Sequence, residues 1–271
     1  MREIGIRQGR LSPAVSGRNQ YFPWHSWKDE FARARTCGFE TVEWLFAAHD
    51  YEHNPVWSEA GQDEILEQAA ATGVQVRCLC ADYFMVHPFF RVSEDARRQS
   101  VAVLNRLVVS GARVGVRVIV VPALEASDIR TVAETTQLLD SLNEPLALAA
   151  AHGVRLGLET ELPGPEYRAL VERRHHPALG VCYDTGNAAA RGYDVAADVR
   201  TLGPYLCEVH IKDRKRNGPS VPLGQGDADF GTFFRAASEA GYRGPLILEA
   251  PAGDEPVSVA AAHLAFLKQQ Q

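Results

Sequence analysis

The amino-acid sequence predicts an α/β fold, a single (β/α)8 TIM barrel formed by residues 1–271. Eight short apolar runs of strand length alternate with eight longer segments that carry apolar residues at three- and four-residue steps. The runs are almost continuously apolar, which is typical of parallel strands covered on both faces. The eight units fill the 271 residues without a linker, and one such barrel usually needs about 250 residues.

Each predicted unit begins with a strand. In chain order the strands are expected at residues 3–7, 41–45, 74–80, 116–121, 154–159, 179–183, 206–211 and 245–249. Eight strands alternating with helices could also form an open, doubly wound sheet. The chain has no Gly-x-Gly-x-x-Gly motif after its first strand, which disfavours the dinucleotide-binding version of that sheet.

A helix is expected after each strand. The predicted helices cover residues 27–35, 58–71, 93–111, 129–151, 167–174, 188–202, 230–240 and 257–268. Glycine stands near the predicted end of four of them, at Gly38, Gly73, Gly153 and Gly241. Glycine is the preferred residue for the left-handed conformation that ends a helix, so these positions support the boundaries.

Composition limits the classes of protein to consider. Hydrophobic residues make up 46% and charged residues 23%, so we expect a large core and little disorder. The net charge of −6 argues against a nucleic-acid partner, and no apolar run approaches the roughly 18 residues of a membrane span. The cysteine count is five, without a Cys-x-x-Cys motif or a visible signal segment, so we expect reduced core cysteines and a cytoplasmic protein.

Ionisable residues lie at the ends of the last four predicted strands. Glu159, Asp184, His210 and Glu249 each follow or end one apolar run. Chemistry in such barrels takes place at the C-terminal ends of the strands, and neighbouring strands lie about 4.8 Å apart. One ionisable residue at a strand end is ordinary, but three carboxylates and one histidine at the ends of consecutive strands indicate that their side chains converge.

Converging carboxylates repel one another unless a cation lies among them. Three carboxylates and one imidazole suit Mn²⁺, Mg²⁺, Co²⁺ or Zn²⁺. The oxygen-rich set favours Mn²⁺ as the first candidate. We therefore expect one divalent metal ion as cofactor.

At these residues the sequence resembles the xylose isomerase-like barrel family of sugar isomerases and epimerases, whose fold is shared by endonuclease IV. The resemblance covers essentially the whole chain and begins with residues 5–12. Its strongest segments are Gly157-Leu158-Glu159-Thr160, Tyr183-Asp184-Thr185-Gly186-Asn187, Val209-His210-Ile211-Lys212-Asp213, residues 221–230 and residues 244–249. Members similar to L-ribulose-5-phosphate 3-epimerase look most like the His-Ile-Lys-Asp and Pro-Leu-Gly-Gln-Gly segments.

The resemblance implies that Glu159, Asp184, His210 and Glu249 bind the metal and that Glu159 and Glu249 also transfer protons. Ketose 3-epimerases of this family carry a substrate-binding His where this chain has Asn187. They also carry an Arg at the position of Arg216. The departure at Asn187 leaves the substrate open.

Together these observations predict an isomerase or epimerase acting on a ketose or ketose phosphate. One carboxylate would remove the proton beside the carbonyl, a metal would stabilise the enediolate, and the second carboxylate would return a proton to the opposite face. Return to the neighbouring carbon would be isomerisation, and loss of a β-hydroxyl would be dehydration. The sequence leaves these three outcomes open.

Other functions remain as alternatives. A metal-dependent dehydratase of a keto-cyclitol or dehydroshikimate-like substrate would use the same residues. An abasic-site endonuclease is disfavoured by the acidic charge and by the absence of additional histidines. A barrel without catalytic activity would have no reason to keep the complete ligand set. Pairing into a homodimer stays open.

Several further residues are candidates for substrate binding. Gln8 and Arg10 follow the first strand, and Glu43 ends the second, where a structural polar layer is the alternative. His87 follows the third strand and could line the pocket or cap a loop. Lys212, Arg214 and Arg216 could meet a phosphate or form a solvated basic loop.

Overall fold

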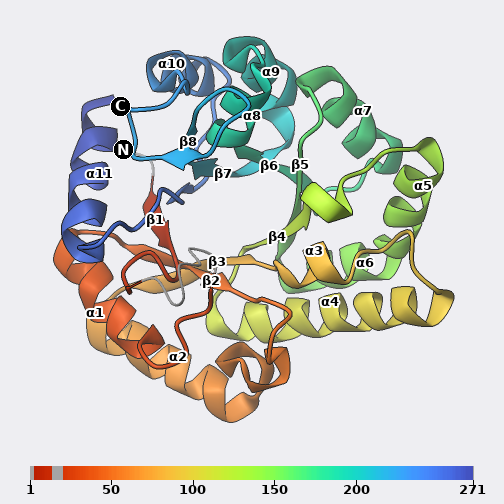
Figure 1. Ribbon diagram of the computed structural model, residues 1–271. Coiled ribbons are helices and arrows are strands. Elements are labelled where there is room, and N and C mark those ends of the chain that lie inside the picture. Colours follow the sequence, from red (N-terminus) through yellow and green to blue (C-terminus); the bar gives the residue numbers. More distant parts are fainter. Residues whose placement is uncertain (1–2, 14–20, 271) are drawn as a thin grey trace.

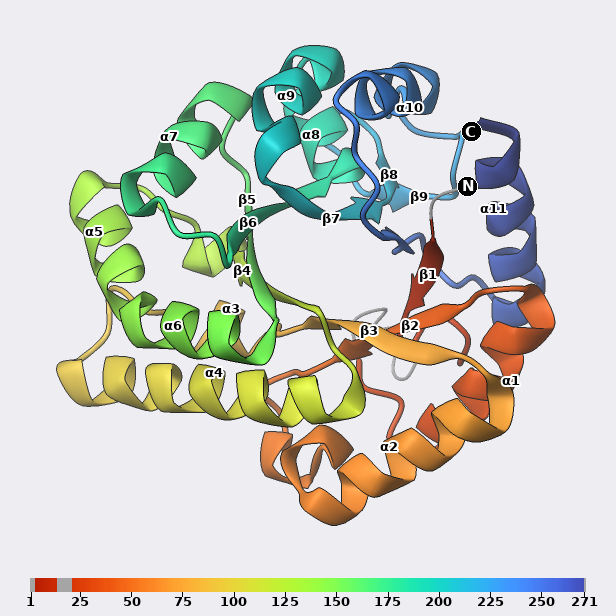
Figure 2. The same ribbon diagram turned by 180° about the vertical axis from the view of Figure 1, so that it is seen from behind.

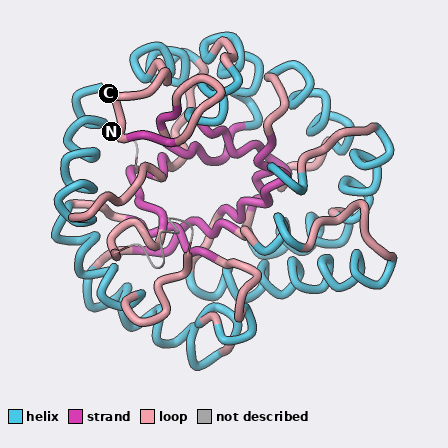
Figure 3. The backbone as a smooth tube through the Cα atoms, in the orientation of Figure 1, coloured by secondary structure: helices cyan, strands magenta, loops and turns pink. Residues whose placement is uncertain are grey.

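The chain folds into the closed parallel barrel that its sequence predicts. A computed structural model describes residues 3–13 and 21–270, so the predicted domain of residues 1–271 includes a few positions outside the described ones. The eight strands follow one another around the barrel in the order β1-β10-β7-β6-β5-β4-β3-β2, and β2 closes onto β1. Figure 3 shows the strands as an inner ring surrounded by helices.

All eight predicted strands are present. They are β1 (Ile4–Arg7), β2 (Thr41–Leu45), β3 (Gln75–Cys80), β4 (Val118–Ala123), β5 (Arg155–Thr160), β6 (Leu179–Asp184), β7 (Leu206–Ile211) and β10 (Leu246–Leu248). Because the barrel is closed, each strand is paired on both sides, and helices cover its outer face. This explains why the strand sequences are continuously apolar.

Helices form the outer layer of the barrel (Figures 1 and 2). They are α1 (Trp27–Cys37), α2 (Glu59–Thr72), α4 (Glu94–Val114), α5 (Val132–Ser141), α6 (Asn143–His152), α7 (Gly164–Arg174), α8 (Thr185–Arg191), α9 (Val195–Leu202), α10 (Phe230–Glu239) and α11 (Pro256–Gln270). The last helix, α11, contacts the first, α1, and so closes the outer layer. None of the helices in the described ranges is long and apolar enough to cross a membrane.

The helix predicted over residues 129–151 is wrong as a single element, because the structure has α5 and α6 there. The two helices meet at Leu142, which is the C-cap of one and the N-cap of the other. Pro145 lies in the first turn of α6 and has no backbone N–H. Its ring would also clash with the carbonyl of Ser141 in a continuous helix, so the chain breaks ahead of it.

The helix predicted over residues 188–202 is also two helices, α8 and α9. Gly192 ends α8 in the left-handed conformation with a φ of 69°, which a residue with a side chain rarely adopts. Asp194 then begins α9 by accepting hydrogen bonds from the backbone N–H groups of Ala196 and Ala197.

Several short elements were not predicted. A hairpin follows β7 and consists of β8 (Asp213–Arg214) and β9 (Ser220–Val221), and a one-turn helix, α3 (Tyr83–Val86), follows β3. Four 3₁₀ turns cover Tyr51–His53, Pro55–Trp57, Glu125–Ser127 and Gly203–Tyr205. Segments this short carry too few residues to show a helical or strand period.

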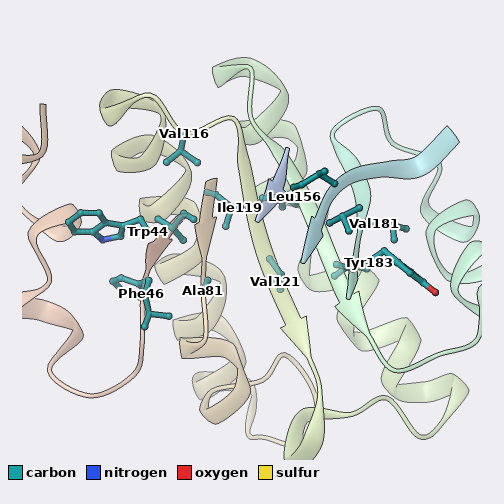
Figure 4. Packing of buried hydrophobic residues seen from close by; sticks show 14 of the residues in the cluster. Trp44, Phe46, Ala81, Val116, Ile119, Val121, Leu156, Val181 and Tyr183 are labelled. Carbon is teal, nitrogen blue, oxygen red and sulfur yellow. The ribbon is translucent and has the colours of Figure 1, made fainter. Parts of the chain in front are cut away.

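The buried apolar residues form two clusters. The larger one lies between the strands and the helices and includes Trp44, Ile119, Leu156 and Val181 (Figure 4). The smaller one contains Cys78, Cys80, Val118, Val120, Cys182, Cys207 and Ile247. All five cysteines are free thiols, as the sequence predicted. Four of them are buried in the core as expected, whereas Cys37 is half-buried.

Candidate active site

The strand register brings the four predicted ligands to one end of the barrel. Asp184 on β6 is the direct neighbour of His210 on β7. On the other side of His210 lies Ile247 of β10, two residues before Glu249. Glu159 lies near the C-terminal end of β5, opposite Pro122. Because all eight strands are parallel, these residues share the C-terminal mouth of the barrel.

The four side chains meet around one nitrogen of His210. The Nδ1 atom lies 3.2 Å from Glu249 Oε2 and 3.5 Å from Glu159 Oε1. Potential ligand atoms of Asp184, His210 and Glu249 all lie within 4.8 Å of one another. All four residues are at most 5% exposed. The convergence expected from the sequence is therefore present, and their roles as metal ligands stay a prediction.

Glu43 contacts the opposite nitrogen of His210. Its Oε1 atom lies 3.0 Å from Nε2, and both residues are fully buried. A carboxylate at this nitrogen favours the tautomer that carries its proton on Nε2, which leaves the lone pair of Nδ1 toward the other carboxylates. The sequence left Glu43 as either a substrate-binding residue or part of a structural polar layer. The structure places it against His210 and not in the wall of the cavity, which favours the polar layer.

Glu208 is a buried neighbour of this pair that the sequence analysis did not single out. Its Oε1 atom lies 3.3 Å from His210 Nε2. Burial and the nearby charge of Glu43 raise the pKa of Glu208 well above its usual value. The sequence spacing could have indicated Glu208. It lies two residues before His210 on β7, and residues two apart on a strand point to the same face.

Cationic side chains surround Glu249. Its Oε1 atom lies 2.7 Å from Arg7 NH1 and 3.1 Å from Lys212 Nζ, which is also 3.5 Å from Asp184 Oδ2. Burial alone would raise the pKa of Glu249, but the charges of Arg7 and Lys212 outweigh it and hold the pKa well below its usual value.

Glu159 has a different surrounding. Burial raises its pKa, and the charges of Asp184 and Glu249 add to that effect, against the opposing influence of His210. The two carboxylates proposed for proton transfer therefore differ in proton affinity.

The side chains fit a divalent cation. Asp184 uses Oδ1 to accept hydrogen bonds from the backbone N–H groups of Gly186 and Asn187. Its buried Oδ2 accepts no hydrogen bond from the described residues, and Lys212 Nζ lies 3.5 Å away from it. In the part of the chain that the structure describes, His210 Nδ1 is likewise buried without a hydrogen bond, and the atoms that approach it are carboxylate oxygens of Glu249 and Glu159. Buried polar atoms without hydrogen-bond partners are costly, and an ion bound between them would remove that cost. Carboxylate oxygens with one imidazole are suitable ligands for Mn²⁺ and related ions.

A cavity of about 500 Å³ opens above these residues. Glu159 and Glu249 line it, as do Asn187, Lys212 and Arg214. Arg7, Arg10, Asp82 and Glu161 also contribute to its wall. Its size is in the range of sites that bind small molecules, so a sugar-sized substrate could reach both carboxylates.

Among the predicted substrate-binding residues, Asn187 lines the cavity. Its Oδ1 atom accepts a hydrogen bond of 2.9 Å from Arg214 NH1. Gln8 instead is buried, and its Oε1 atom accepts a hydrogen bond from the backbone N–H of Leu45. Gln8 therefore ties the end of β1 to β2 and does not line the cavity.

His87 and Arg216 lie away from the cavity. His87 is exposed and packs on Tyr83, with ring centroids 4.5 Å apart. Arg216 is exposed, and its backbone N–H donates to Asp227. Of the three basic residues considered in this segment, Lys212 and Arg214 line the cavity and Arg216 does not. The structure thus gives no support to a substrate contact by His87 or Arg216.

Asp213 holds the loop that follows the hairpin. It is fully buried, and its carboxylate accepts hydrogen bonds from the backbone N–H groups of Gly224, Gly226 and Ala228. The Pro-Leu-Gly-Gln-Gly segment, singled out in the sequence for its resemblance, is therefore fixed next to the hairpin that carries Arg214.

The fold and the site define a (β/α)8 barrel with a buried cluster of potential metal ligands at the C-terminal ends of its strands. The family model of the xylose isomerase-like TIM barrel matches residues 31–270, and the chain belongs to this family. The resemblance found in the sequence is thereby confirmed.

Similar proteins include several sugar epimerases. L-ribulose-5-phosphate 3-epimerase UlaE of Salmonella typhi is 26% identical over 231 residues, which cover 82% of this chain and 81% of that protein. D-psicose 3-epimerase from Clostridium cellulolyticum H10 has a similar structure, with a TM-score of 0.80, 17% identity and 98% of each chain covered. For 3-keto-D-glucoside 4-epimerase YcjR from E. coli the TM-score is 0.78, with 20% identity and coverage of 99% and 100%.

Proposed function

We propose that the protein is a metal-dependent epimerase of a ketose or ketose phosphate. The observation that carries this proposal is the pair of buried carboxylates, Glu159 and Glu249, which both line the cavity and both approach His210 Nδ1. Its similarity to L-ribulose-5-phosphate 3-epimerase and D-psicose 3-epimerase supports the same reaction class.

Glu159 and Glu249 come from different sides of the barrel mouth. Their strands, β5 and β10, are three steps apart around the barrel, with β6 and β7 between them. A ketose bound between the two carboxylates would present one face of the reacting carbon to each. One carboxylate removes the proton next to the carbonyl, and the other delivers a proton to the opposite face, which inverts that carbon.

Glu159, Asp184, His210 and Glu249 would hold the ion in this proposal, and Glu43 would orient His210. A bound divalent ion, Mn²⁺ first and Mg²⁺, Co²⁺ or Zn²⁺ as alternatives, supplies Lewis-acid stabilisation of the negative charge that develops on the substrate oxygens. Lys212 and Arg7 keep Glu249 ionised, so that it can accept a proton. A cytoplasmic location and a homodimer stay predictions from the sequence.

Deuterium exchange tests the proposed function. The protein is incubated with Mn²⁺ in D₂O together with a panel of ketoses and ketose phosphates, and the products are examined by NMR. We expect deuterium at one carbon next to the carbonyl and formation of the epimer at that carbon. His210→Asn should lose both, whereas the exposed Arg243→Gln, at the opposite end of the barrel, should lose neither.

Two outcomes would contradict the proposal. Protein that binds Mn²⁺ but exchanges no proton of any ketose would not be an epimerase. Loss of water from a keto-cyclitol, with an enone as product, would identify the dehydratase that the sequence left as an alternative.

A further inference from the structure

We propose that Arg10 and Arg214 form a site for the phosphoryl group of a phosphorylated ketose. This inference rests on the proposed function, because it names the substrate of the same cavity. Arg10 and Arg214 are cationic side chains of the cavity wall that lie beyond hydrogen-bond distance of the carboxylates of the site. The proposal gives these two side chains a ligand.

Arg10 is a buried guanidinium with few partners. It lines the cavity and is 4% exposed, and its Nε atom makes no hydrogen bond to any of the described residues. Within the described part of the chain its one ion pair is with Glu249, whose Oε1 lies 3.7 Å from Arg10 NH2, and the carboxylates of Asp82 and Glu30 act on it from farther away. Glu249 Oε1 is already closer to Arg7 and to Lys212. The charge of Arg10 is therefore only weakly compensated.

Arg214 is held in place by neutral groups. Its NH1 donates to Asn187 Oδ1 at 2.9 Å, and its Nε and NH2 donate to the carbonyl oxygen of Gly218 at 3.2 and 3.0 Å. The described residues place no carboxylate within ion-pair distance of it. These hydrogen bonds orient the guanidinium at the cavity wall and leave its charge available to a ligand.

Arg7 provides the contrast within the same cavity. It makes two short ion pairs, 2.6 Å to Asp82 Oδ2 and 2.7 Å to Glu249 Oε1. Lys212 is likewise placed between Asp184 and Glu249. These two cations belong to the carboxylate cluster, whereas Arg10 and Arg214 remain for an anion that comes with the substrate.

The barrel order places the two arginines on either side of one strand. Arg10 follows β1 and Arg214 lies in the hairpin after β7, and β10 is the strand between β1 and β7. Adjacent strands are about 4.8 Å apart, so two long side chains from these loops could reach one anion. Ser220 pairs with Arg214 in the hairpin and also lines the cavity, where its hydroxyl is a further donor.

A phosphoryl group matches this wall better than a neutral sugar does. Guanidinium groups bind phosphate with two parallel hydrogen bonds, and a phosphate monoester carries nearly two negative charges. A neutral ketose offers uncharged hydroxyl and carbonyl groups, which would leave both arginine charges uncompensated when water is displaced. We therefore expect the enzyme to prefer the phosphorylated form of its ketose.

The first test measures the binding of inorganic phosphate to the Mn²⁺-loaded protein by calorimetry. We expect Arg10→Gln and Arg214→Gln each to weaken phosphate binding at least tenfold, with unchanged metal content. Arg243→Gln, which removes an exposed arginine before β10, should bind phosphate like the unmodified protein. Because Arg214 is half-buried in a surface hairpin, its variant should fold even if Arg10→Gln does not. Equal phosphate affinity in Arg214→Gln and the unmodified protein would overturn the site.

The second test compares substrates. The ratio of kcat/KM for a ketose phosphate to that for the free ketose should be high in the unmodified protein and should fall at least tenfold in Arg214→Gln. Equal turnover of both ketoses by the unmodified protein would overturn the phosphate site while leaving the epimerase function intact. Phosphate binding that depends on Arg214, without proton exchange in any ketose, would instead support the anion site and refute the proposed reaction.

Discussion

Glu43 and His210 form a fully buried contact, with Glu43 Oε1 3.0 Å from His210 Nε2. They come from β2 and β7, which are not adjacent, so the contact crosses the interior of the barrel. It occupies the nitrogen of His210 that faces away from Glu159 and Glu249. The geometry makes Glu43 a positioning residue for the proposed metal ligand.

Replacement of Glu43 should weaken metal binding. In Glu43→Gln the neutral amide can no longer increase the basicity of His210, and we expect the affinity for Mn²⁺ to fall by about 10- to 100-fold. Calorimetric titration of the metal-free protein with Mn²⁺ measures this directly, without an activity assay. Glu40→Gln, an exposed carboxylate three residues earlier, serves as the control. A change of less than twofold in Glu43→Gln would rule out the positioning role.

The two proposed proton-transfer residues should fail in different ways. In the proposed reaction Glu159 and Glu249 act from opposite sides of the substrate, so Glu159→Gln and Glu249→Gln should each slow epimerisation by about 100-fold or more. Each variant should still exchange the proton of one epimer with D₂O, and the two variants should differ in which epimer exchanges. NMR of each purified epimer, at a metal concentration that saturates the variant, checks this. Exchange of both epimers by both variants would show that another group transfers the protons.

The loop held by Asp213 should not tolerate a side chain at Gly226. A Cβ atom built on Gly226 would lie 1.9 Å from Asp213 Oδ1, which is far inside van der Waals contact. Because Asp213 is fully buried and bonded to three backbone N–H groups, Gly226→Ala should lower the free energy of unfolding by about 1–3 kcal/mol. Urea unfolding measures the change.

Gly231→Ala in α10 is the matched control for that substitution. The nearest atoms to its added Cβ would be at 3.6 and 3.7 Å, which is ordinary contact. We expect it to be neutral or to stabilise the protein by up to about 1 kcal/mol, because alanine is the better helix former. Equal stability of both alanine variants would contradict the role assigned to Asp213.

The protein should lose stability between pH 4.5 and 7 through Glu30. Burial raises the pKa of this carboxyl from 4.5 to about 7, although Gly9, Ser12 and Leu11 donate hydrogen bonds to it. Ionisation is therefore harder in the folded state than in the unfolded chain. The contribution of protonated Glu30 to the free energy of unfolding is complete below pH 4.5 and is lost as the pH rises through about 7. Its total is about 3 kcal/mol.

Urea unfolding of the unmodified protein and of Glu30→Gln over this pH range checks the contribution of Glu30. Over this pH range the free energy of unfolding of Glu30→Gln should change by about 3 kcal/mol less than that of the unmodified protein. Glu40→Gln, at an exposed position, should keep the pH dependence of the unmodified protein. Parallel pH profiles for Glu30→Gln and the unmodified protein would show that Glu30 ionises normally.

The positions of the strands and the convergence of Glu159, Asp184, His210 and Glu249 could be predicted from the sequence, because both follow from local patterns. A strand buried on both faces needs a continuous apolar run, and parallel strands present their C-terminal ends at one edge of a barrel. Helix breaks were harder to predict, since Pro145 and Gly192 lie in stretches whose apolar spacing still looks helical.

The partners of the polar side chains were decided by the tertiary structure. The sequence alone placed Glu43 at a strand end, but its contact with His210 depends on how the barrel closes between strands far apart in the chain. Likewise, Arg214 reaches the cavity and Arg216 does not, because Arg214 lies on a strand of the hairpin and Arg216 lies in its turn. The hairpin is too short to show a periodic pattern in the sequence. Spacing along a strand determines which face a residue occupies, whereas the distance to a partner across the barrel depends on register and closure, which are set by long-range pairing.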